Sequence, residues 1–377
     1  MRHICYVSGT RADYGLMEEV LHGIEASPEL SLSILVTGMH LLSAYGDTYK
    51  EIEAAGFDIH AKVPVNLSGG GGAEMAHAVG EEIIGFTAAL NARRPDLLLL
   101  LGDRGEMLAA AIAAIHLNIP IVHLHGGERS GTVDESIRHA VSKLSHYHFV
   151  ASSDSRTRLI KMGEQADTVF VTGAPGLDAI YSAKLQGKEN LAKKYQFDAE
   201  RPFQLILFHP VVQQASIAEE QMQTLLRAVL ETCEQPLIIM PNADSGASGI
   251  VSVINRFCVK EQHFKSVLHI PRNDYLSLVA GADVLIGNSS SGIIEAASLQ
   301  TPVVNVGDRQ NARERNANVI DVAPAFELIK EAILVAKQMK GKHWDNCYGD
   351  GISAERIVQY LRCIPLDAKI MEKLNAY

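Results

Sequence analysis

The chain has 377 residues, more than the ~150 that one hydrophobic core usually organises, so we expect two domains. Its 34 Lys and Arg against 44 Asp and Glu give a net charge of −10, which argues against a nonspecific nucleic-acid surface. The N-terminus lacks a signal-peptide core, no apolar run is as long as a membrane span, and five scattered cysteines are typical of reduced thiols, so we expect a cytoplasmic protein without stable membrane insertion.

Apolar runs of strand length alternate with helical segments through the first half of the chain. Five consecutive leucines at 97–101 show no polar alternation, as expected for a central strand that helices cover on both faces. Such alternation is typical of βαβ units in a parallel sheet. We therefore predict strands at 4–7, 32–36, 97–101, 119–124 and 148–151, with helices at 14–27, 74–92, 105–117 and 134–145. Four glycines at 69–72 predict a mobile surface loop.

The sequence TGAPG at 172–176 interrupts this rhythm and predicts a domain boundary. The rhythm restarts with predicted strands at 204–208, 237–240, 266–270, 284–286 and 302–306. A last helical stretch could pack back on the first domain. We therefore predict an α/β protein with two Rossmann-like, doubly wound parallel-sheet domains, at 1–173 and 174–360, and a C-terminal helix at 361–377 that packs on the first.

Polar, glycine-rich segments follow the predicted strands, which is where ligands of open parallel sheets bind. After the first strand, SGTRADYG at 8–15 offers Gly9 for a tight turn, free helix amides for an anion, and the charge of Arg11. The turn could equally be structural. Neither a dinucleotide-binding glycine pattern nor a P-loop occurs, which disfavours a dehydrogenase and a P-loop NTPase.

Carboxylates and arginines follow two further strands of the first half. Asp103 and Arg104 come after the leucine strand, where Asp103 could cap the next helix or help to stabilise separating charges. Glu128 follows a pair of glycines that bring the backbone close to a ligand. Asp134 and Arg138 are four residues apart on a predicted helix, so they could form an ion pair or contact a substrate together.

Three histidines come at or just after predicted strands. His123 and His125 would share one face of a strand and resemble half of a zinc site, but without nearby cysteines we predict no metal. His209, in the second half, could donate a hydrogen bond to phosphate, act as an acid or base, or be a core residue.

The segment IGNSSSGIIE at 286–295 is the strongest local signal in the second half. Ser289, Ser290 and Gly292 open a helix whose amides and hydroxyls could hold a diphosphate, while Glu295 could accept hydrogen bonds from ribose hydroxyls. Plain helix capping is the alternative. Beyond the next strand, Arg309 offers further positive charge.

Taken together, these motifs resemble the hydrolysing UDP-N-acetylglucosamine 2-epimerases of bacterial sialic acid biosynthesis. The resemblance covers nearly the whole chain, through GTRADYG, TGMHLLSAYGDTY, GDRGE, GGERSGTVDESIRHAVSKLSHYH, FHP and IGNSSSGIIEA in the family's order. It implies the GT-B architecture, in which two Rossmann-like domains face a cleft, together with a homo-oligomer and no cofactor. The implied reaction eliminates UDP from UDP-N-acetylglucosamine to give 2-acetamidoglucal, which is hydrated to N-acetylmannosamine.

The resemblance also implies roles for individual residues. Asp103, Glu128 and Asp134 would be the catalytic carboxylates, with His209 acting near the diphosphate. Related enzymes often carry glutamate where this chain has His125, so either Glu128 takes over that work or His125 does it differently. The residues expected to bind the substrate or UDP are Arg11, Arg104, His125, Arg138, Asn242, Ser289, Ser290, Gly292, Glu295 and Arg309.

Several other functions fit parts of this pattern. A GT-B glycosyltransferase would use the same nucleotide site, a non-hydrolysing epimerase would return UDP to the glucal, and a hydrolysing relative could act on a diacetamido sugar. A nucleotide-sugar sensor would keep the serine-rich segment and need none of the acids of the first domain. A periplasmic binding protein is disfavoured, because we see no signal peptide.

Overall fold

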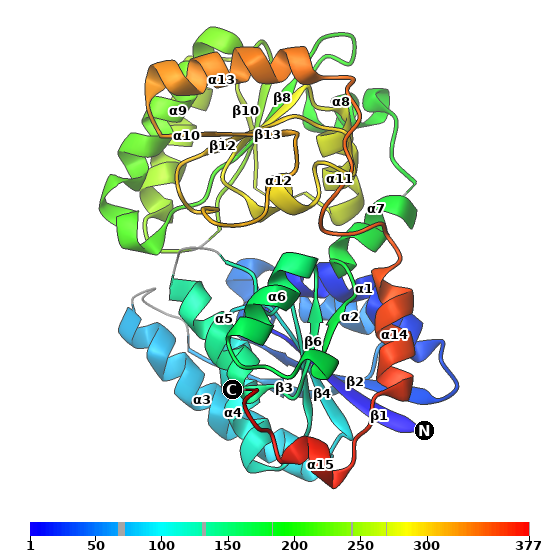
Figure 1. Cartoon of the computed structure of the whole chain (residues 1–377). Helices are drawn as coiled ribbons and strands as arrows, with labels where there is room; N and C mark the ends of the chain where they lie inside the picture. Colours follow the sequence, from blue (N-terminus) through cyan, green and yellow to red (C-terminus); the bar gives the residue numbers. More distant parts are fainter. Residues whose placement is uncertain (67–71, 130–132, 183, 243, 269, 377) are drawn as a thin grey trace. The chain divides into compact units, whose positions relative to one another are not determined.

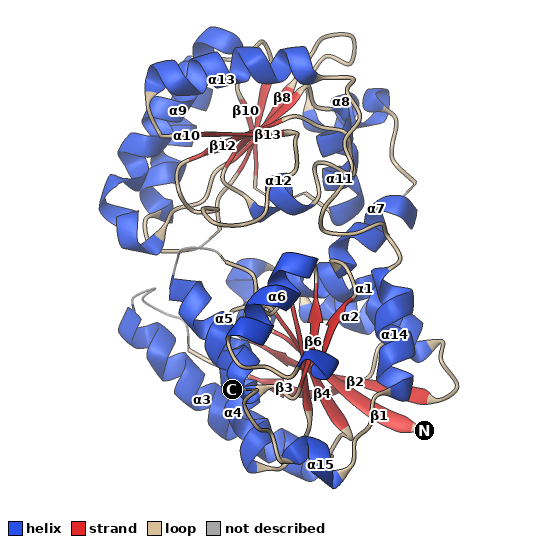
Figure 2. Ribbon diagram, in the orientation of Figure 1, coloured by secondary structure: helices blue, strands red, loops and turns tan. Residues whose placement is uncertain are grey.

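The chain folds into two compact units, each built on a parallel β-sheet between layers of helices (Figures 1 and 2). A computed structural model describes residues 1–377 except 67–71, 130–132, 183, 243, 269 and 377. The first unit contains Met1–Glu128, Val133–Ala179 and Tyr348–Tyr377, and the second contains Arg129 and Ile180–Cys347. The predicted class, α/β with two doubly wound parallel-sheet domains, is confirmed. The predicted glycine loop lies outside the described residues, apart from Gly72.

The sheet of the first unit has seven parallel strands in the order β3-β2-β1-β4-β5-β6-β7. All five strands predicted for this half are confirmed, with ends that shift by a few residues, whereas β3 and β7 were not predicted. The strands are β1 Arg2–Ser8, β2 Leu30–Thr37, β3 Ile59–Val63, β4 Leu97–Leu101, β5 Ile121–Leu124, β6 Tyr147–Val150 and β7 Val169–Val171.

Helices cover both faces of this sheet, as the leucines of β4 show. Leu97, Leu99 and Leu101 belong to the core on one face, and Leu98 and Leu100 belong to the core on the other. The strand is therefore apolar at every position, because both of its faces are buried. The helices of this unit are α1 Arg11–Glu25, α2 Tyr49–Ala54, α3 Gly72–Ala92, α4 Gly105–His116, α5 Val133–Leu144, α6 Ser153–Lys161, α14 Ser353–Cys363 and α15 Ala368–Met371, and the unit boundary falls within α7 Asp178–Ser182.

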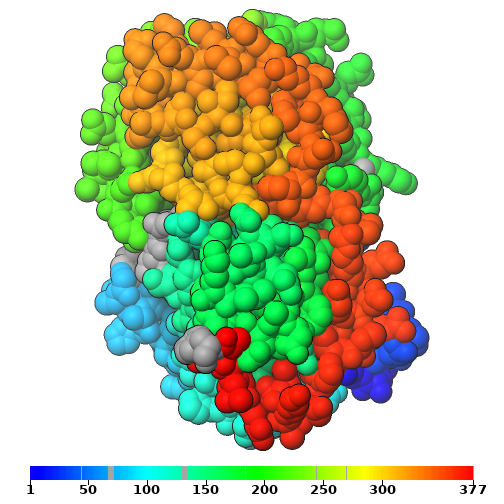
Figure 3. Space-filling view, viewed as in Figure 1, coloured from blue at the N-terminus to red at the C-terminus, as the bar shows by residue number. Residues whose placement is uncertain are grey.

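The C-terminal residues belong to the first unit, where α14 packs beside α1 and the last residues, red in Figure 3, lie on the surface. The unit boundaries fall after Ala179 and after Cys347, whereas the sequence predicted them after 173 and after 360. The difference has a local cause. The N–H of Ala174 donates to the carbonyl of Tyr348 at 2.8 Å, and the carboxylate of Asp178 accepts from the N–H groups of Ser353 and Ala354 at the start of α14. These contacts tie both flanking segments to the first unit.

The second unit has a six-stranded parallel sheet in the order β10-β9-β8-β11-β12-β13. Its five predicted strands are confirmed, and β13 was not predicted. The strands are β8 Gln204–Leu207, β9 Pro236–Ile239, β10 Lys265–Val267, β11 Val284–Gly287, β12 Val303–Val306 and β13 Val319–Val322. The helices are α8 Lys188–Tyr195, α9 Ala218–Thr232, α10 Ala247–Lys260, α11 Arg272–Gly281, α12 Ser290–Ile294 and α13 Phe326–Met339.

Glycine is required where β11 ends. Gly287 has φ +142°, and a Cβ there would lie 1.9 Å from the carbonyl oxygen of Leu207. The backbone after β11 can therefore follow the end of β8 closely, which positions the serine-rich segment. Over the part of the chain that the structure describes, no helix is both long enough and apolar enough to cross a membrane.

Candidate active site

Each sheet has one place where the strand order reverses, and ligands of such sheets bind beyond the carboxyl ends of the strands there. In the first unit this place lies between β1 and β4, and in the second unit between β8 and β11. The residues that follow these four strands include Gly9, Asp103, His209 and Ser289. The polar segments predicted from the sequence therefore stand at the two positions where a doubly wound sheet binds ligands.

The turn after β1 is organised by Asp13, which the sequence prediction missed. Asp13 is buried, and its Oδ2 accepts from the N–H groups of Gly9 and Thr10 at 3.1 and 2.7 Å, while Oδ1 accepts from the hydroxyl of Ser8. Thr10 and Asp13 also form a capping box at the start of α1. The available signal for Asp13 in the sequence was the spacing T-x-x-D at 10–13. This spacing is typical of the start of a helix rather than of a ligand-binding motif.

Two predicted binding arginines of the first unit have carboxylate partners. Arg11 is the first residue of α1, and its Nε lies 2.7 Å from Oε2 of Glu51. Nε of Arg104 lies 3.2 Å from Oε1 of Glu106, which is buried beside the turn after β1. A Cβ at Gly9 would lie 2.9 Å from Glu106, so glycine allows the two turns to meet. Contact of Arg11 or Arg104 with a substrate stays a prediction.

A buried arginine connects the predicted catalytic acids. Arg138 on α5 is 2% exposed, and its Nη2 donates to Oδ2 of Asp103 just after β4. Its Nη1 donates to the carbonyl oxygen of His125 at 2.8 Å and lies 3.6 Å from Oε2 of Glu128. The structure thus brings together four of the predicted site residues, from three segments of the chain. Arg138 thus places one positive charge beside two carboxylates, of which Glu128 is buried.

The loop after β5 has an unusual backbone that sets the position of His125. β5 ends at Leu124, and His125 has φ +60°, a left-handed conformation that is uncommon outside glycine. Gly127 has φ +75°, and a Cβ there would lie 2.5 Å from the carbonyl oxygen of Ser155, so only glycine fits. Nδ1 of His125 forms a hydrogen bond with Oε1 of Glu128, which is 4% exposed.

The prediction that His123 and His125 share one face of a strand is wrong, because the chain leaves the strand before His125. His123 is fully buried, where its ring nitrogens lie 2.7 Å from the carbonyl oxygen of Gly102 and 3.0 Å from the hydroxyl of Ser142. Burial lowers the pKa of His123 to about 3, so its ring is neutral. Within the described ranges, no group of three or more His, Cys, Asp or Glu residues is arranged to hold a metal ion.

Asp134 lies in the first turn of α5, one turn before Arg138, so the two residues occupy the same side of the helix. Its side chain is half-buried. Arg138 also contacts Asp103 and the loop after β5, which both lie outside α5. The catalytic role of Asp134 stays a prediction.

In the second unit, Asn288 holds His209 in place, and the sequence prediction missed this residue. Asn288 follows β11, its Oδ1 accepts from the N–H of His209 at 2.7 Å, and its Nδ2 donates to the carbonyl of His209 at 2.8 Å. The carbonyl of Asn288 in turn accepts from Nη1 of Arg309 at 3.2 Å. The Asn of the GNSSSG segment was the available signal, but its pairing with the end of β8 is visible only in the fold.

The ring of His209 is prepared to donate a hydrogen bond. The N–H of Asn242 donates to Nδ1 at 3.1 Å, so Nε2 carries the proton of the neutral ring. Burial, followed by the positive charge of Arg309, lowers the pKa of His209 to about 3. At neutral pH the side chain is therefore an uncharged donor. Of the roles left open for His209, donation to a phosphate oxygen is the one that this tautomer supports.

The serine-rich segment begins α12, as the sequence predicted. Ser289 is the N-cap, Ser290 is the first helical residue, and the backbone at Gly292 packs so closely on β12 that a Cβ would lie 3.1 Å from Val303. Glu295 is 4% exposed and accepts two hydrogen bonds from Arg272, at 2.9 and 3.0 Å. Arg272 was not predicted. Its partner Glu295 keeps lone pairs for other donors, because a carboxylate has about four acceptor positions.

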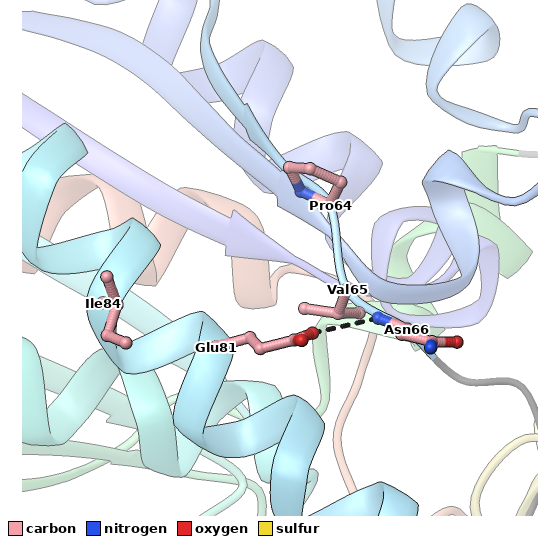
Figure 4. A pocket seen from close by; sticks show the side chains of 5 residues that line it. All are labelled: Pro64, Val65, Asn66, Glu81 and Ile84. Atoms are coloured by element: carbon pink, nitrogen blue, oxygen red, sulfur yellow. Dashed lines mark hydrogen bonds between the residues drawn. The ribbon is translucent and has the colours of Figure 1, made fainter.

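An open pocket lies elsewhere on the first unit, between the end of β3 and α3 (Figure 4). Pro64, Val65, Asn66, Glu81 and Ile84 line it, and Figure 4 shows Glu81 reaching to the N–H of Asn66, a 3.0 Å hydrogen bond. None of the predicted site residues lines this pocket.

Comparison with known proteins identifies relatives along the whole chain. The family model described as UDP-N-acetylglucosamine 2-epimerase matches residues 22–362. The hydrolysing UDP-N,N'-diacetylbacillosamine 2-epimerase of Legionella pneumophila is 50% identical over 377 residues, 100% of each chain. The hydrolysing GDP/UDP-N,N'-diacetylbacillosamine 2-epimerase of Campylobacter jejuni is 36% identical over 324 residues, 85% of this chain and 84% of its own.

A solved structure shows the same fold. The crystal structure of UDP-GlcNAc 2-epimerase from Neisseria meningitidis bound to UDP-GlcNAc matches with a TM-score of 0.81 over 95% of this chain and 99% of that chain, at 18% identity. At this identity the likeness concerns the fold alone.

Proposed function

The chain belongs to the UDP-N-acetylglucosamine 2-epimerase family, and from this premise we propose that its substrate is a UDP-activated diacetamido sugar, UDP-N,N'-diacetylbacillosamine. At the coarser level, the chain is a hydrolysing UDP-sugar 2-epimerase. The proposed products are UDP and the free sugar with inverted configuration at C2.

One observation carries the choice of sugar. The relative that is 50% identical over the full length of both chains is named for the diacetamido substrate, and so is the relative at 36%. UDP-N-acetylglucosamine was the substrate expected from the sequence, with a diacetamido sugar as an alternative. The two sugars differ at C4, which bears an acetamido group in place of a hydroxyl, and at C6, which is a methyl in place of a hydroxymethyl group. The predicted place in sialic acid biosynthesis stays a prediction.

The proposed mechanism begins with the departure of the nucleotide. The neutral His209 would donate from Nε2 to the diphosphate, while Arg309 and the amides at the start of α12 would stabilise the charge that develops on UDP. Arg272 and Glu295 would position the nucleoside. These groups stabilise the negative charge by donating hydrogen bonds and do not transfer a proton to the diphosphate. UDP would therefore leave as an anion.

The acids of the first unit would carry the proton transfers at the sugar. The C2 proton is not acidified by a neighbouring carbonyl group, so cleavage of the C1–O bond has to run ahead and leave positive charge on C1. Asp103 would stabilise this cation, and the cluster of Glu128, His125 and Asp134 would exchange protons with C2. Elimination and hydration exchange no electrons with an external acceptor, so the reaction requires no redox cofactor.

Turnover in deuterated water, followed by NMR, tests the proposal. We expect free UDP and a C2-deuterated product from UDP-N,N'-diacetylbacillosamine, with kcat/KM above that for UDP-N-acetylglucosamine by on the order of 10²-fold. Equal or greater kcat/KM for UDP-N-acetylglucosamine would overturn the choice of sugar. An epimerised sugar that still carries UDP would identify a non-hydrolysing enzyme. Two unchanged substrates would favour a sensor.

The roles of the acids are tested separately. We expect Asp103→Asn and Glu128→Gln each to lower kcat by ~10²-fold or more while UDP still binds. Unchanged rates in both variants would remove these two carboxylates from the mechanism.

A further inference from the structure

One nitrogen of the acid cluster is left without a partner. His125 is 8% exposed, and its Nε2 is buried and accepts or donates no hydrogen bond among the residues that the structure describes. Burying a polar atom without a hydrogen bond costs free energy, so such atoms are rare in folded proteins and often have a function. The neighbouring polar atoms of this cluster are engaged: Glu128 contacts both His125 and Arg138, and Arg138 contacts Asp103.

The contact with Glu128 decides which ring nitrogen carries the proton. An ionised carboxylate only accepts hydrogen bonds, so the bond between Nδ1 and Oε1 of Glu128 places the proton on Nδ1. When the ring carries this one proton, its lone pair is on Nε2, the nitrogen without a partner among the described residues. A histidine held at Nδ1 by a carboxylate, with a free Nε2, is a general arrangement for accepting a proton from a reacting group.

The backbone also fixes the position of this ring. The carbonyl oxygen of His125 accepts from Nη1 of Arg138 at 2.8 Å, and the residue has φ +60°. A left-handed conformation at a non-glycine residue costs free energy and persists where the surroundings enforce it, which is common at functional sites. Here the enforcing contacts are Arg138 and the tight turn at Gly127. The ring is thus held at Nδ1 and through its backbone.

We propose that His125 is the catalytic base of the elimination and that Glu128 is a positioning residue that acts through it. The inference rests on the proposed function, because it assigns a step of that reaction. Nε2 takes the C2 proton, the electron pair of the C2–H bond forms the C1=C2 double bond, and the C1–O bond breaks with its electrons on UDP. The imidazolium that results is stabilised by the carboxylate of Glu128.

The second half of the reaction restores the base. A water hydroxyl adds to C1, and a different acid delivers a proton to the opposite face of C2, which inverts the configuration. The proton of that water replaces the one that the acid has donated, and the imidazolium of His125 loses its proton to solvent. Two proton-transfer groups on opposite faces of the sugar are needed, so His125 supplements the acids Asp103 and Asp134 and does not replace them.

Chemical rescue tests this role with the full-length protein. We expect His125→Ala to lower kcat by ~10²-fold or more with KM changed by less than ~3-fold, and added imidazole to restore turnover in proportion to the basicity of substituted imidazoles. His125→Gln can still donate an amide hydrogen to Glu128, so it checks that the loss is not one of folding. It should be as slow as His125→Ala. The Glu128→Gln variant should turn over slowly, and imidazole should not accelerate it, because the ring of His125 still occupies the position that imidazole would take.

The matched control is His116→Ala, because His116 is exposed at the C-terminal end of α4. This variant should keep full activity, and imidazole should not change its rate. His125→Gln with kcat within ~3-fold of the unaltered protein would overturn the proposal, and so would imidazole that fails to accelerate His125→Ala. The unaltered protein is assayed alongside. If it converts no UDP-sugar, the proposed function fails, whereas normal turnover with either of the two contrary results removes only His125 from the mechanism.

Discussion

Glu164 is a buried carboxylate that holds the C-terminal residues against the first unit, and its replacement gives the sharpest test of the fold. It is 1% exposed, and three cationic or donor groups surround it: Nζ of Lys143 and Nζ of Lys373, each at 2.7 Å, and Nε2 of His148 at 3.0 Å. Burial alone would raise the pKa of Glu164. The hydrogen bonds from His148, Lys143 and Lys373 outweigh it and lower the pKa to about 2.

The pKa gives the expected size of the effect. A fall from 4.5 to about 2 is about 2.5 units, and one unit corresponds to ~1.4 kcal/mol, so the ionised Glu164 contributes about 3 kcal/mol to the free energy of unfolding. We therefore expect Glu164→Gln to destabilise the first unit by about 3 kcal/mol near neutral pH. Because the folded-state pKa lies below the unfolded one, this contribution is present above about pH 4.5 and is lost as the pH falls to about 2.

The assay has to report on the first unit. Hydrogen exchange of peptides from β6, which carries His148, measures its opening during urea unfolding. Fluorescence of Trp344, the single tryptophan, follows the second unit and should be unchanged. Glu219→Gln is the control, because Glu219 pairs with Arg256 while 51% exposed, and it should cost under ~0.5 kcal/mol. A loss below ~1 kcal/mol for Glu164→Gln, or one that does not shrink toward acid pH, would refute the reasoning.

Three further substitutions test separate parts of the structure. Arg138→Lys keeps the charge but cannot bridge two partners, so we expect kcat to fall ~10²-fold while the UDP Kd from calorimetry changes less than ~3-fold; an unchanged kcat would contradict this. Glu295→Gln weakens the pair with Arg272 and should raise the Kd for UDP by ~10-fold, whereas an unchanged affinity would separate that pair from nucleotide binding. Burial and the charge of Glu106 raise the pKa of Glu82 to about 8, so the unaltered protein loses stability as the pH rises from about 4.5 through 8. Glu82→Gln should abolish this loss, giving a higher Tm at about pH 9 and an equal one at about pH 4.5; the same Tm difference at both would refute it.

The central strands could be predicted from the sequence, whereas the edge strands β3, β7 and β13 could not, and of the edge strands only β10 was predicted. β4 is apolar at every position because it is buried on both faces, so its pattern is unmistakable. β3 and β13 lie at the sheet edges, are mostly half-exposed, and contain charged residues such as Lys62 and Asp321. Their sequences resemble loops, because an edge strand needs less apolar surface to stay in place.

The site was predictable where it follows a strand, and its side-chain partners were not. Parallel strands bring their carboxyl ends to one edge, so the segments after β1, β4, β5, β8 and β11 could be selected from the sequence. Arg138 illustrates the limit. Its spacing from Asp134 predicts a helical surface pair, yet the guanidinium is 2% exposed and bonds Asp103, 35 residues away along the chain. Arg272, which pairs with Glu295, begins a different helix and carries no local signal.

A net charge of −10 does not attract a diphosphate at long range, so its recognition has to depend on contacts at short range. The groups that we propose for this recognition act at short range. Arg138 compensates Asp103 and Glu128, so the acid cluster does not present two uncompensated negative charges. His209 and the backbone at Asn288 offer dipoles rather than charge, and Arg309 supplies one nearby cation. Fixed dipoles bind an anion at short range only. The affinity for UDP should therefore depend weakly on salt, and a steep loss of binding between ~50 and ~500 mM salt would contradict this assignment of the donors.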